Sequence, residues 1–124
     1  MANRITYGTV LAASGTTILD RVVGADGDPF DQADLSSITC AVYDITTGTD
    51  VAVITPSIVI SSVVYDTLQT GALWENRDAT GYNFAHALPV TAFPTAAHVY
   101  KVIYTFTPAS GAVCLTEYHV TTEG

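Results

Sequence analysis

Apolar and polar residues alternate along most of the chain, and this period of two is typical of β-strands. The clearest case is residues 38–44, where Ile38, Cys40 and Val42 share one face. Similar runs rich in β-branched and aromatic residues predict strands over residues 5–11, 16–23, 50–55, 57–65, 81–88, 99–107 and 112–122. No stretch shows an amphipathic helical pattern of even three turns, so we expect an all-β chain with no long helix.

Turn-forming residues separate the predicted strands. Residues 24–33 contain Gly-Ala-Asp-Gly-Asp-Pro and predict a loop, and residues 46–49 predict a hairpin turn. We expect the two longest connections, residues 24–37 and 66–80, to cross between sheets. About seven or eight strands joined in this way predict an antiparallel sandwich or barrel with Greek-key connections.

The last two predicted strands form the best-defined hairpin in the sequence. Residues 99–107 place Tyr100, Val102, Tyr104 and Phe106 on one face, and residues 108–111, Pro-Ala-Ser-Gly, predict the turn. With a turn of this length Phe106 is expected opposite Val113, and Tyr104 opposite Leu115. We expect this hairpin to form the centre of one sheet.

Length and charge narrow the classes of function. The 124 residues suit a single domain, residues 1–124, and only 13% of them are charged. The net charge is −8, and the four basic residues are scattered along the chain. Nucleic acids and anionic membranes are bound through clustered cations, so we expect neither as a partner. No signal peptide or membrane span is visible, so we expect synthesis in a host cytoplasm.

Both cysteines, Cys40 and Cys114, fall within predicted strands. The favoured interpretation is two buried, reduced thiols that pack as small apolar side chains. A disulfide is the alternative if the two strands are neighbours. A nucleophilic role would need a base and an electropositive setting, which the sequence does not indicate.

The acidic loop carries Asp26, Asp28, Asp31 and Asp34, and clustered carboxylates are ligands that Ca²⁺ prefers. However, the spacing differs from the EF-hand loop and Pro29 interrupts it. The favoured interpretation is turn chemistry at residues 26–29 and a helix cap at Asp34. We therefore expect no bound metal and no cofactor.

Other candidate chemistry is weak. The three histidines, His86, His98 and His119, lie in separate segments without the paired spacing of a zinc site. Glu117 could pair with another carboxylate for glycoside hydrolysis, but the sequence gives no separation. Neither a nucleophile elbow nor a phosphate-binding glycine loop occurs, so we expect no enzymatic activity. Trp74, the only tryptophan, either packs a loop onto the core or anchors a partner.

Several packing and turn motifs carry a family resemblance: residues 24–29, residues 32–44, Trp74 with Asp78 and residues 81–84, and the Tyr-x-Val-x-Tyr-x-Phe strand with its glycine turn. Together they resemble small immunoglobulin-like domains among the structural proteins of tailed bacteriophage particles. The resemblance implies an immunoglobulin-like β-sandwich and brings no catalytic residues. It does not extend to the antibody signature, because Trp74 lies beyond Cys40 and no tyrosine stands two residues before Cys114.

The resemblance implies a structural, non-enzymatic virion component. We expect a capsid decoration (cement) protein that binds the major capsid protein as a homo-oligomer. The alternatives are a tail, neck or baseplate protein, and a module that binds carbohydrate or a cell surface through Trp74, Tyr82 and the long loops. The residues expected at an interface are Asp26, Asp28, Phe30, Trp74, Arg77 and Tyr82.

Overall fold

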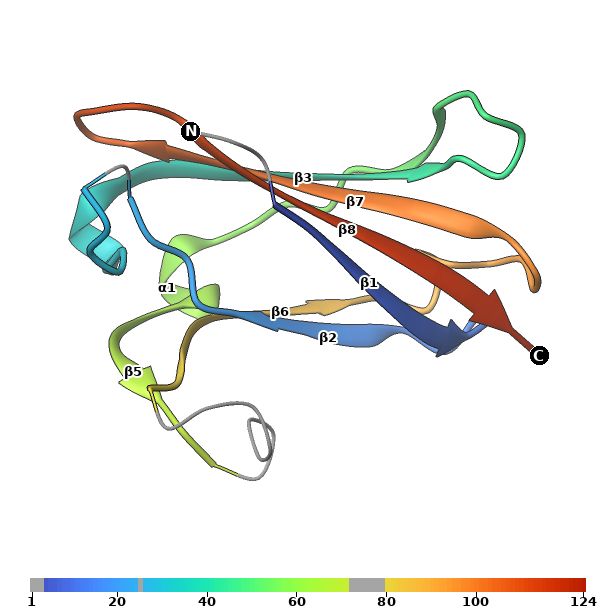
Figure 1. Cartoon of the computed structure of the whole chain (residues 1–124), viewed down its shortest axis with the longest axis horizontal. Helices are drawn as coiled ribbons and strands as arrows, with labels where there is room; N and C mark the ends of the chain where they lie inside the picture. The colour runs from blue at the N-terminus through green and yellow to red at the C-terminus, as the bar shows by residue number, and fades with distance from the viewer. Residues whose placement is uncertain (1–3, 25, 72–79) are drawn as a thin grey trace.

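The chain folds into two β-sheets that pack face to face (Figure 1). The computed structural model describes residues 4–24, 26–71 and 80–124. The larger sheet holds, in spatial order, β1 (Arg4–Leu11), β8 (Cys114–Glu123), β7 (Val99–Pro108), β3 (Leu35–Asp44) and β4 (Val51–Ile54). The smaller sheet holds β2 (Thr16–Asp20), β6 (Tyr82–Leu88) and β5 (Val64–Gln69). The predicted all-β sandwich without a long helix is confirmed.

The strand order is that of an immunoglobulin-like sandwich. Strands β8-β7-β3-β4 follow the order G-F-C-C′, and β2-β6-β5 follow the order B-E-D. The first strand, β1, pairs in parallel with β8, whereas the other neighbouring strands are antiparallel. The expected crossing between sheets at residues 24–37 is confirmed. The expected crossing at residues 66–80 is wrong, because β5 and β6 are neighbours in the same sheet.

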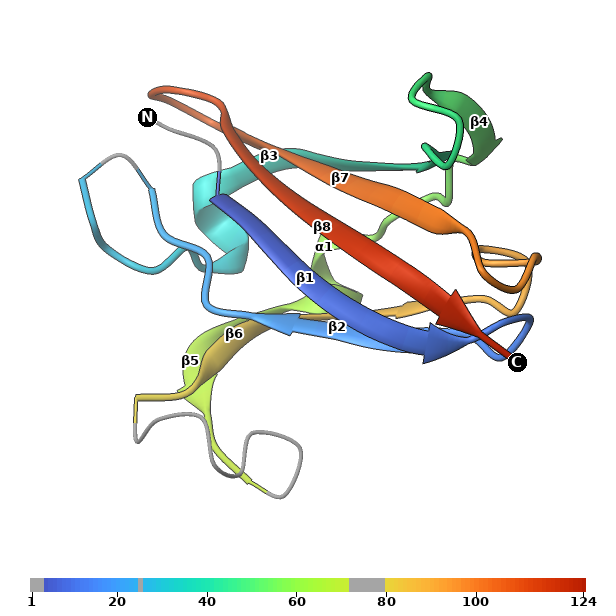
Figure 2. The ribbon, with the colours of Figure 1, turned by 45° about the vertical axis from the view of Figure 1, so that its right-hand side comes forward.

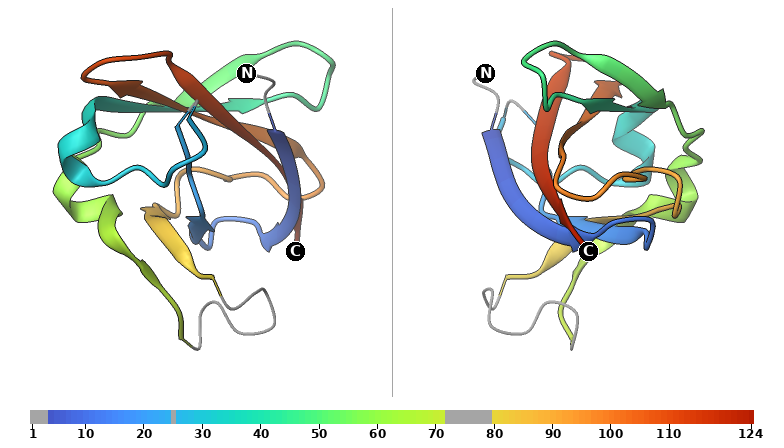
Figure 3. Two further views of the ribbon diagram at one scale, coloured as in Figure 1. Left: turned by 60° about the vertical axis from the view of Figure 1, so that its left-hand side comes forward. Right: turned by 90° about the vertical axis from the view of Figure 1, so that its right-hand side faces the viewer.

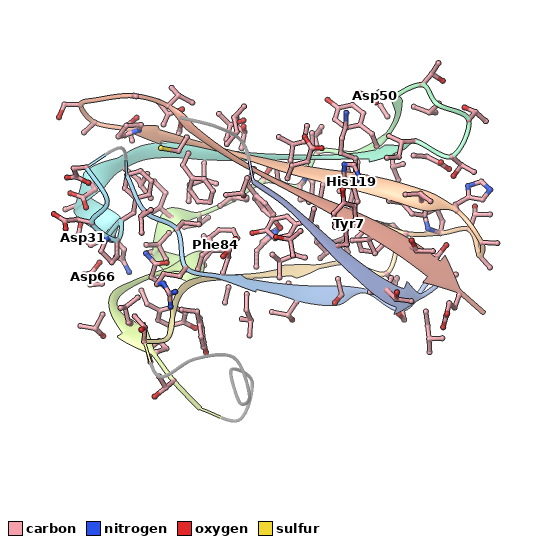
Figure 4. The ribbon with its side chains drawn as sticks, viewed as in Figure 1. Tyr7, Asp31, Asp50, Asp66, Phe84 and His119 are labelled. Carbon is pink, nitrogen blue, oxygen red and sulfur yellow. The ribbon has the colours of Figure 1, made fainter. Side chains whose placement is uncertain are left out.

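The core lies between the inward faces of the two sheets, as the alternation predicts. The inward residues of β7, Tyr100, Val102, Tyr104 and Phe106, are all 0% exposed. From the opposite sheet Phe84 contacts the rings of Tyr104 and Phe106 edge-on, at centroid distances of 4.9 and 5.2 Å (Figure 4). Fully burying an aromatic side chain of this size stabilises a fold by roughly 1.5–3 kcal/mol, so the inward residues of β7 make a large contribution to the stability of the core. Its central position in the larger sheet is also as expected.

Two buried hydrogen bonds join the two sheets. The Tyr104 hydroxyl on β7 lies 2.7 Å from Nδ1 of His86 on β6. The Tyr118 hydroxyl on β8 donates to the carboxylate of Asp20 on β2. Each of these four buried polar groups has a hydrogen-bond partner, so none of them adds the free-energy cost of an unpaired polar group to the core.

The turn before β7 is a tyrosine corner, a feature of immunoglobulin-like domains. Tyr100 lies at the start of β7, and its hydroxyl accepts a hydrogen bond of 2.9 Å from the backbone N–H of Thr95, five residues upstream. Thr122 on β8 donates to the carbonyl of Thr95 at 2.6 Å and so fixes the same turn from the other side. The antibody pattern places a cysteine two residues after this tyrosine, whereas here Val102 occupies that position.

Cys40 and Cys114 are buried free thiols. Cys40 on β3 pairs with Tyr104, and Cys114 on β8 pairs with Phe106, so β7 lies between the two cysteines. Strands two positions apart are roughly 10 Å from each other, which exceeds the reach of a disulfide. The interpretation as buried, reduced thiols is therefore confirmed.

The predicted strand over residues 57–65 is wrong. The chain there forms a short helical turn, α1 (Ile60–Val63), and β5 starts only at Val64. The segment connects strands of opposite sheets; Val63 of the helical turn and Val64 of β5 are buried, and Ile60 packs against the core. The predicted strand over residues 16–23 likewise ends early, at Asp20.

The predicted register of the β7–β8 hairpin is wrong by one residue. Phe106 pairs with Cys114 and Tyr104 pairs with Thr116, rather than with Val113 and Leu115. The turn between the strands is one residue longer than expected. A shift of one residue exchanges the two faces of a strand, and the observed register keeps Cys114 buried while Val113 is 51% exposed.

Candidate functional site

Two connections at one end of the sandwich line an open pocket of about 440 Å³. One wall is the connection between β2 and β3, and the other is the turn between β7 and β8. Figure 1 shows these two connections at the same end of the sandwich. We call this cavity the loop-end pocket. Its lining residues are Gly24, Asp26, Asp28, Phe30, Ala33, Asp34, Pro108, Ala109, Ser110, Gly111 and Ala112.

The buried side chain of Asn83 on β6 holds the base of the acidic loop. Its Nδ2 donates to the carbonyls of Val22 and Phe30 at 2.9 and 2.8 Å, and its Oδ1 accepts from the N–H of Val22 at 2.7 Å. A further backbone hydrogen bond of 3.1 Å joins Phe30 to Val22 directly. Asn83 is only 1% exposed, so it fixes both ends of the loop from within the core.

Hydrogen bonds within the loop shape its tip. The N–H of Gly24 donates to the carbonyl of Asp28 at 2.9 Å, and the N–H of Asp28 donates to Oδ1 of Asp26 at 3.0 Å. Gly27 has a φ of +86°, a left-handed conformation that favours glycine. The turn chemistry predicted for residues 26–29 is confirmed, and both aspartates remain exposed.

A helix cap and two longer-range hydrogen bonds fix the second half of the loop. Asp31 caps the short 3₁₀ helix, η1 (Gln32–Asp34), and shares a reciprocal capping box with Asp34. The N–H of Gln32 donates to Oδ1 of Asp66 at 2.8 Å; Figure 4 shows Asp31 and Asp66 at this end of the molecule. The carbonyl of Asp34 accepts from the N–H of Ala109 at 2.9 Å and thus joins the two walls of the pocket. The cap predicted at Asp34 is wrong: Asp31 is the N-cap, and Asp34 is the third residue of the helix, whose carboxylate accepts from the N–H of Asp31.

The loop-end pocket is acidic. Asp26, Asp28 and Asp34 contribute carboxylates, and none of the lining residues is basic. A pocket lined by charges of one sign concentrates ligands of the opposite sign, so this one favours a cationic group such as a lysine or arginine side chain. Within the part of the chain that the structure describes, no group of three or more His, Cys, Asp or Glu residues could hold a metal ion.

The residues expected at an interface have different positions. Asp26 and Asp28 line the pocket together. Phe30 is 6% exposed and stacks on Phe106 at a centroid distance of 6.2 Å, so it is a core residue behind the pocket rather than a free contact residue. Tyr82 lies on β6, where it contacts the ring of Tyr65 edge-on at 5.8 Å, and it does not line the pocket. Trp74 and Arg77 lie outside the described residues.

Sequence reasoning missed the second wall of the pocket, residues 108–112. The small residues of this turn indicated only a hairpin. The contact between this turn and the acidic loop depends on the strand order, because β3 begins where its antiparallel neighbour β7 ends. The one signal in the sequence was the shortness of these side chains, which leaves space between the loops.

The three histidines take separate structural roles. His86 is buried and bonds Tyr104, and its burial lowers the pKa of the imidazole. His98 lies 2.6 Å from the carboxylate of Asp44, and His119 lies 2.6 Å from the carboxylate of Glu117. A hydrogen bond from Thr46 and the contact with His98 lower the pKa of Asp44.

Comparison of the chain with protein-family models, with curated proteins and with solved structures returns no match. Among the described residues, no helix is long and apolar enough to cross a membrane. The site therefore has to be interpreted from its own geometry.

Proposed function

We propose that this chain is a structural, non-enzymatic component of a tailed-phage virion, and specifically a capsid decoration protein. It binds the surface of the major capsid protein as a homo-oligomer. The observation that carries the proposal is the loop-end pocket, which two connections form at one end of an immunoglobulin-like sandwich. Loops on a rigid β-sandwich are a common arrangement for binding a protein partner.

The chemistry of the pocket supports a protein partner. Asp26 and Asp28 are exposed on a loop whose backbone is fixed by Asn83, so little conformational entropy is lost on binding. Their carboxylates would receive basic side chains of the capsid surface. The buried ring of Phe30 supplies an apolar base behind them.

Binding to capsids tests the proposal. Empty capsids assembled from the major capsid protein of the same genome are sedimented with the purified chain. We expect saturable binding at a fixed ratio to capsid subunits, and Asp26→Asn with Asp28→Asn should weaken it at least about tenfold. The asparagine at position 26 keeps the acceptor for the N–H of residue 28, so the loop retains its shape.

A matched control makes the same change of charge elsewhere. Asp50→Asn with Glu123→Gln also removes two carboxylates, and neither residue lines the pocket. This control should bind like the wild type. Absence of binding to capsids would reject the decoration role, and binding to purified tails instead would assign the chain to the tail, neck or baseplate.

A further inference from the structure

The four edge strands of the sandwich differ in how they block further pairing. Strand β4 has four residues and a register shift against β3, and β5 has a register shift against β6. Strand β2 has five residues and carries the inward-pointing Asp20. Strand β1 has eight residues, contains no proline, has a single charged residue at its first position, Arg4, and pairs with β8 without a register shift. Short strands, bulges and inward charges protect an edge, so β1 is the unprotected one.

The exposed side chains of β1 are large and apolar. Tyr7 is 73% exposed and Leu11 is 61% exposed, and both lie on the outer face of the sheet. Figure 3 shows β1 at the outside of the larger sheet, beyond β8. Exposed aromatic and aliphatic groups along an open strand edge are typical of a surface that pairs with another strand.

A shallow groove of about 190 Å³ runs between β1 and β2, which lie side by side in Figure 2. The residues that line it are Thr6, Tyr7, Gly8, Thr9, Val10, Thr16, Thr17, Ile18, Leu19, Tyr118 and Val120. None of them is charged. The groove shares no lining residue with the acidic loop-end pocket.

We propose that β1 is a self-association edge, which pairs antiparallel with β1 of a second copy of this chain about a two-fold axis. The pairing joins the two five-stranded sheets into one continuous sheet. Such an interface is self-complementary, because the same strand serves on both sides. This inference rests on the homo-oligomer in the proposed function and assigns the surface that forms it.

The charge distribution favours a second copy as the occupant. Two copies that each carry a net charge of −8 repel one another. The electrostatic repulsion at a contact between them is therefore smallest where the surface carries no carboxylates. Residues 5–11 are uncharged, and the lining of the adjacent groove is uncharged. A basic partner would instead be attracted to the carboxylates of the loop-end pocket. The neutral edge therefore suits a copy of the chain itself.

The experiment measures the mass of the isolated chain in solution, without capsids. Sedimentation velocity from about 1 to 200 µM covers the affinity expected for an interface of this small size. We expect the wild type to shift with concentration from 13.1 kDa to twice that mass. Tyr7→Lys with Thr9→Lys places four lysines along the paired edge, and it should raise the dimer dissociation constant at least about tenfold.

The control variant adds two lysines at exposed apolar positions elsewhere. Val59→Lys with Val90→Lys makes the same change in net charge, at residues that are 63% and 56% exposed. Its dimer should match the wild type, and thermal unfolding checks that both variants fold. As a second readout, amide exchange in β1 should slow as the wild-type concentration rises.

Three results would overturn the assignment: a wild type that stays monomeric, a lysine variant of β1 that dimerises like the wild type, or a control variant that loses the dimer equally. Capsid binding is measured on separate samples. A monomer that still binds capsids rejects the self-association edge and leaves the decoration role standing.

Discussion

Replacing Asn83 by leucine should destabilise the fold and loosen the acidic loop together. Leucine has the same number and branching of side-chain heavy atoms as asparagine but cannot form hydrogen bonds. The change removes the partners of the N–H of Val22 and the carbonyl of Phe30. The carbonyl of Val22 also loses one bond, but it keeps the N–H of Phe30 at 3.1 Å. Two buried backbone groups are therefore left without a partner.

The expected magnitude follows from this count. Each buried polar group without a partner costs about 1–3 kcal/mol, so two of them cost about 2–6 kcal/mol. The loop can open to admit water, which places the expected loss in free energy of unfolding near 3 kcal/mol. Total stabilities are about 5–15 kcal/mol, so the variant should remain folded and measurable.

Urea denaturation gives the free energy of unfolding of the variant, and Gln69→Leu is the control. Among the residues that the structure describes, the Gln69 amide bonds only Thr67, two residues away and in an exposed position, so this change should cost less than about 0.5 kcal/mol. Amide exchange of Phe30 should accelerate in Asn83→Leu more than exchange of Val102 in the core. If the free energy changes by less than about 1 kcal/mol and the exchange of Phe30 is unaltered, Asn83 does not hold the loop.

Three further predictions concern the buried groups. Tyr104→Phe removes the hydroxyl that lies 2.7 Å from His86, and urea denaturation should show a loss of about 1–2 kcal/mol. Burial lowers the pKa of His86 below its ordinary value of 6.5, so the unfolded chain binds more protons than the folded chain as the pH falls through that value. The free energy of unfolding should therefore decrease between pH 7.5 and pH 5. The decrease should be less steep in His86→Gln. Burial raises the pKa of Cys40 to about 11, and Cys114 is also buried. A thiol reagent should therefore label both cysteines slowly in the native state and rapidly in guanidinium.

Alternation identified the core because burial acts on every second residue of a strand. The predicted face of residues 99–107 is the buried face of β7, from Tyr100 to Phe106. The register of the following hairpin was wrong because it depends on the conformation of the turn, where Gly111 has a φ of +103°. Residues 57–65 were misassigned because their β-branched side chains suit a strand, whereas the chain crosses between the sheets there through a helical turn.

Only half of the loop-end pocket could be predicted from the sequence. Asp26 and Asp28 lie in a run of turn-forming residues, which can be recognised from the sequence. Asn83 acts on residues 53 and 61 positions away, and the turn at residues 108–112 meets the acidic loop through strand pairing. In the sequence, Asn83 is a polar residue in a strand whose side chains alternate between two faces, and nothing marks it as buried. Its buried position follows only from the packing of the two sheets.

The two proposed surfaces have opposite electrostatic character, and salt should separate them. Contacts of Asp26 and Asp28 with basic side chains are exposed ion pairs, which weaken as the Debye length falls from about 10 Å at 0.1 M salt to about 3 Å at 1 M. Pairing along the uncharged residues 5–11 of β1 is not weakened by screening, and salt strengthens it because the repulsion between two chains of net charge −8 is reduced. Raising sodium chloride from about 0.1 to 1 M should therefore weaken capsid binding and strengthen self-association, each measured by sedimentation. Parallel weakening of both would mean that charged groups also carry the contact between copies, and the neutral edge would then be the wrong surface.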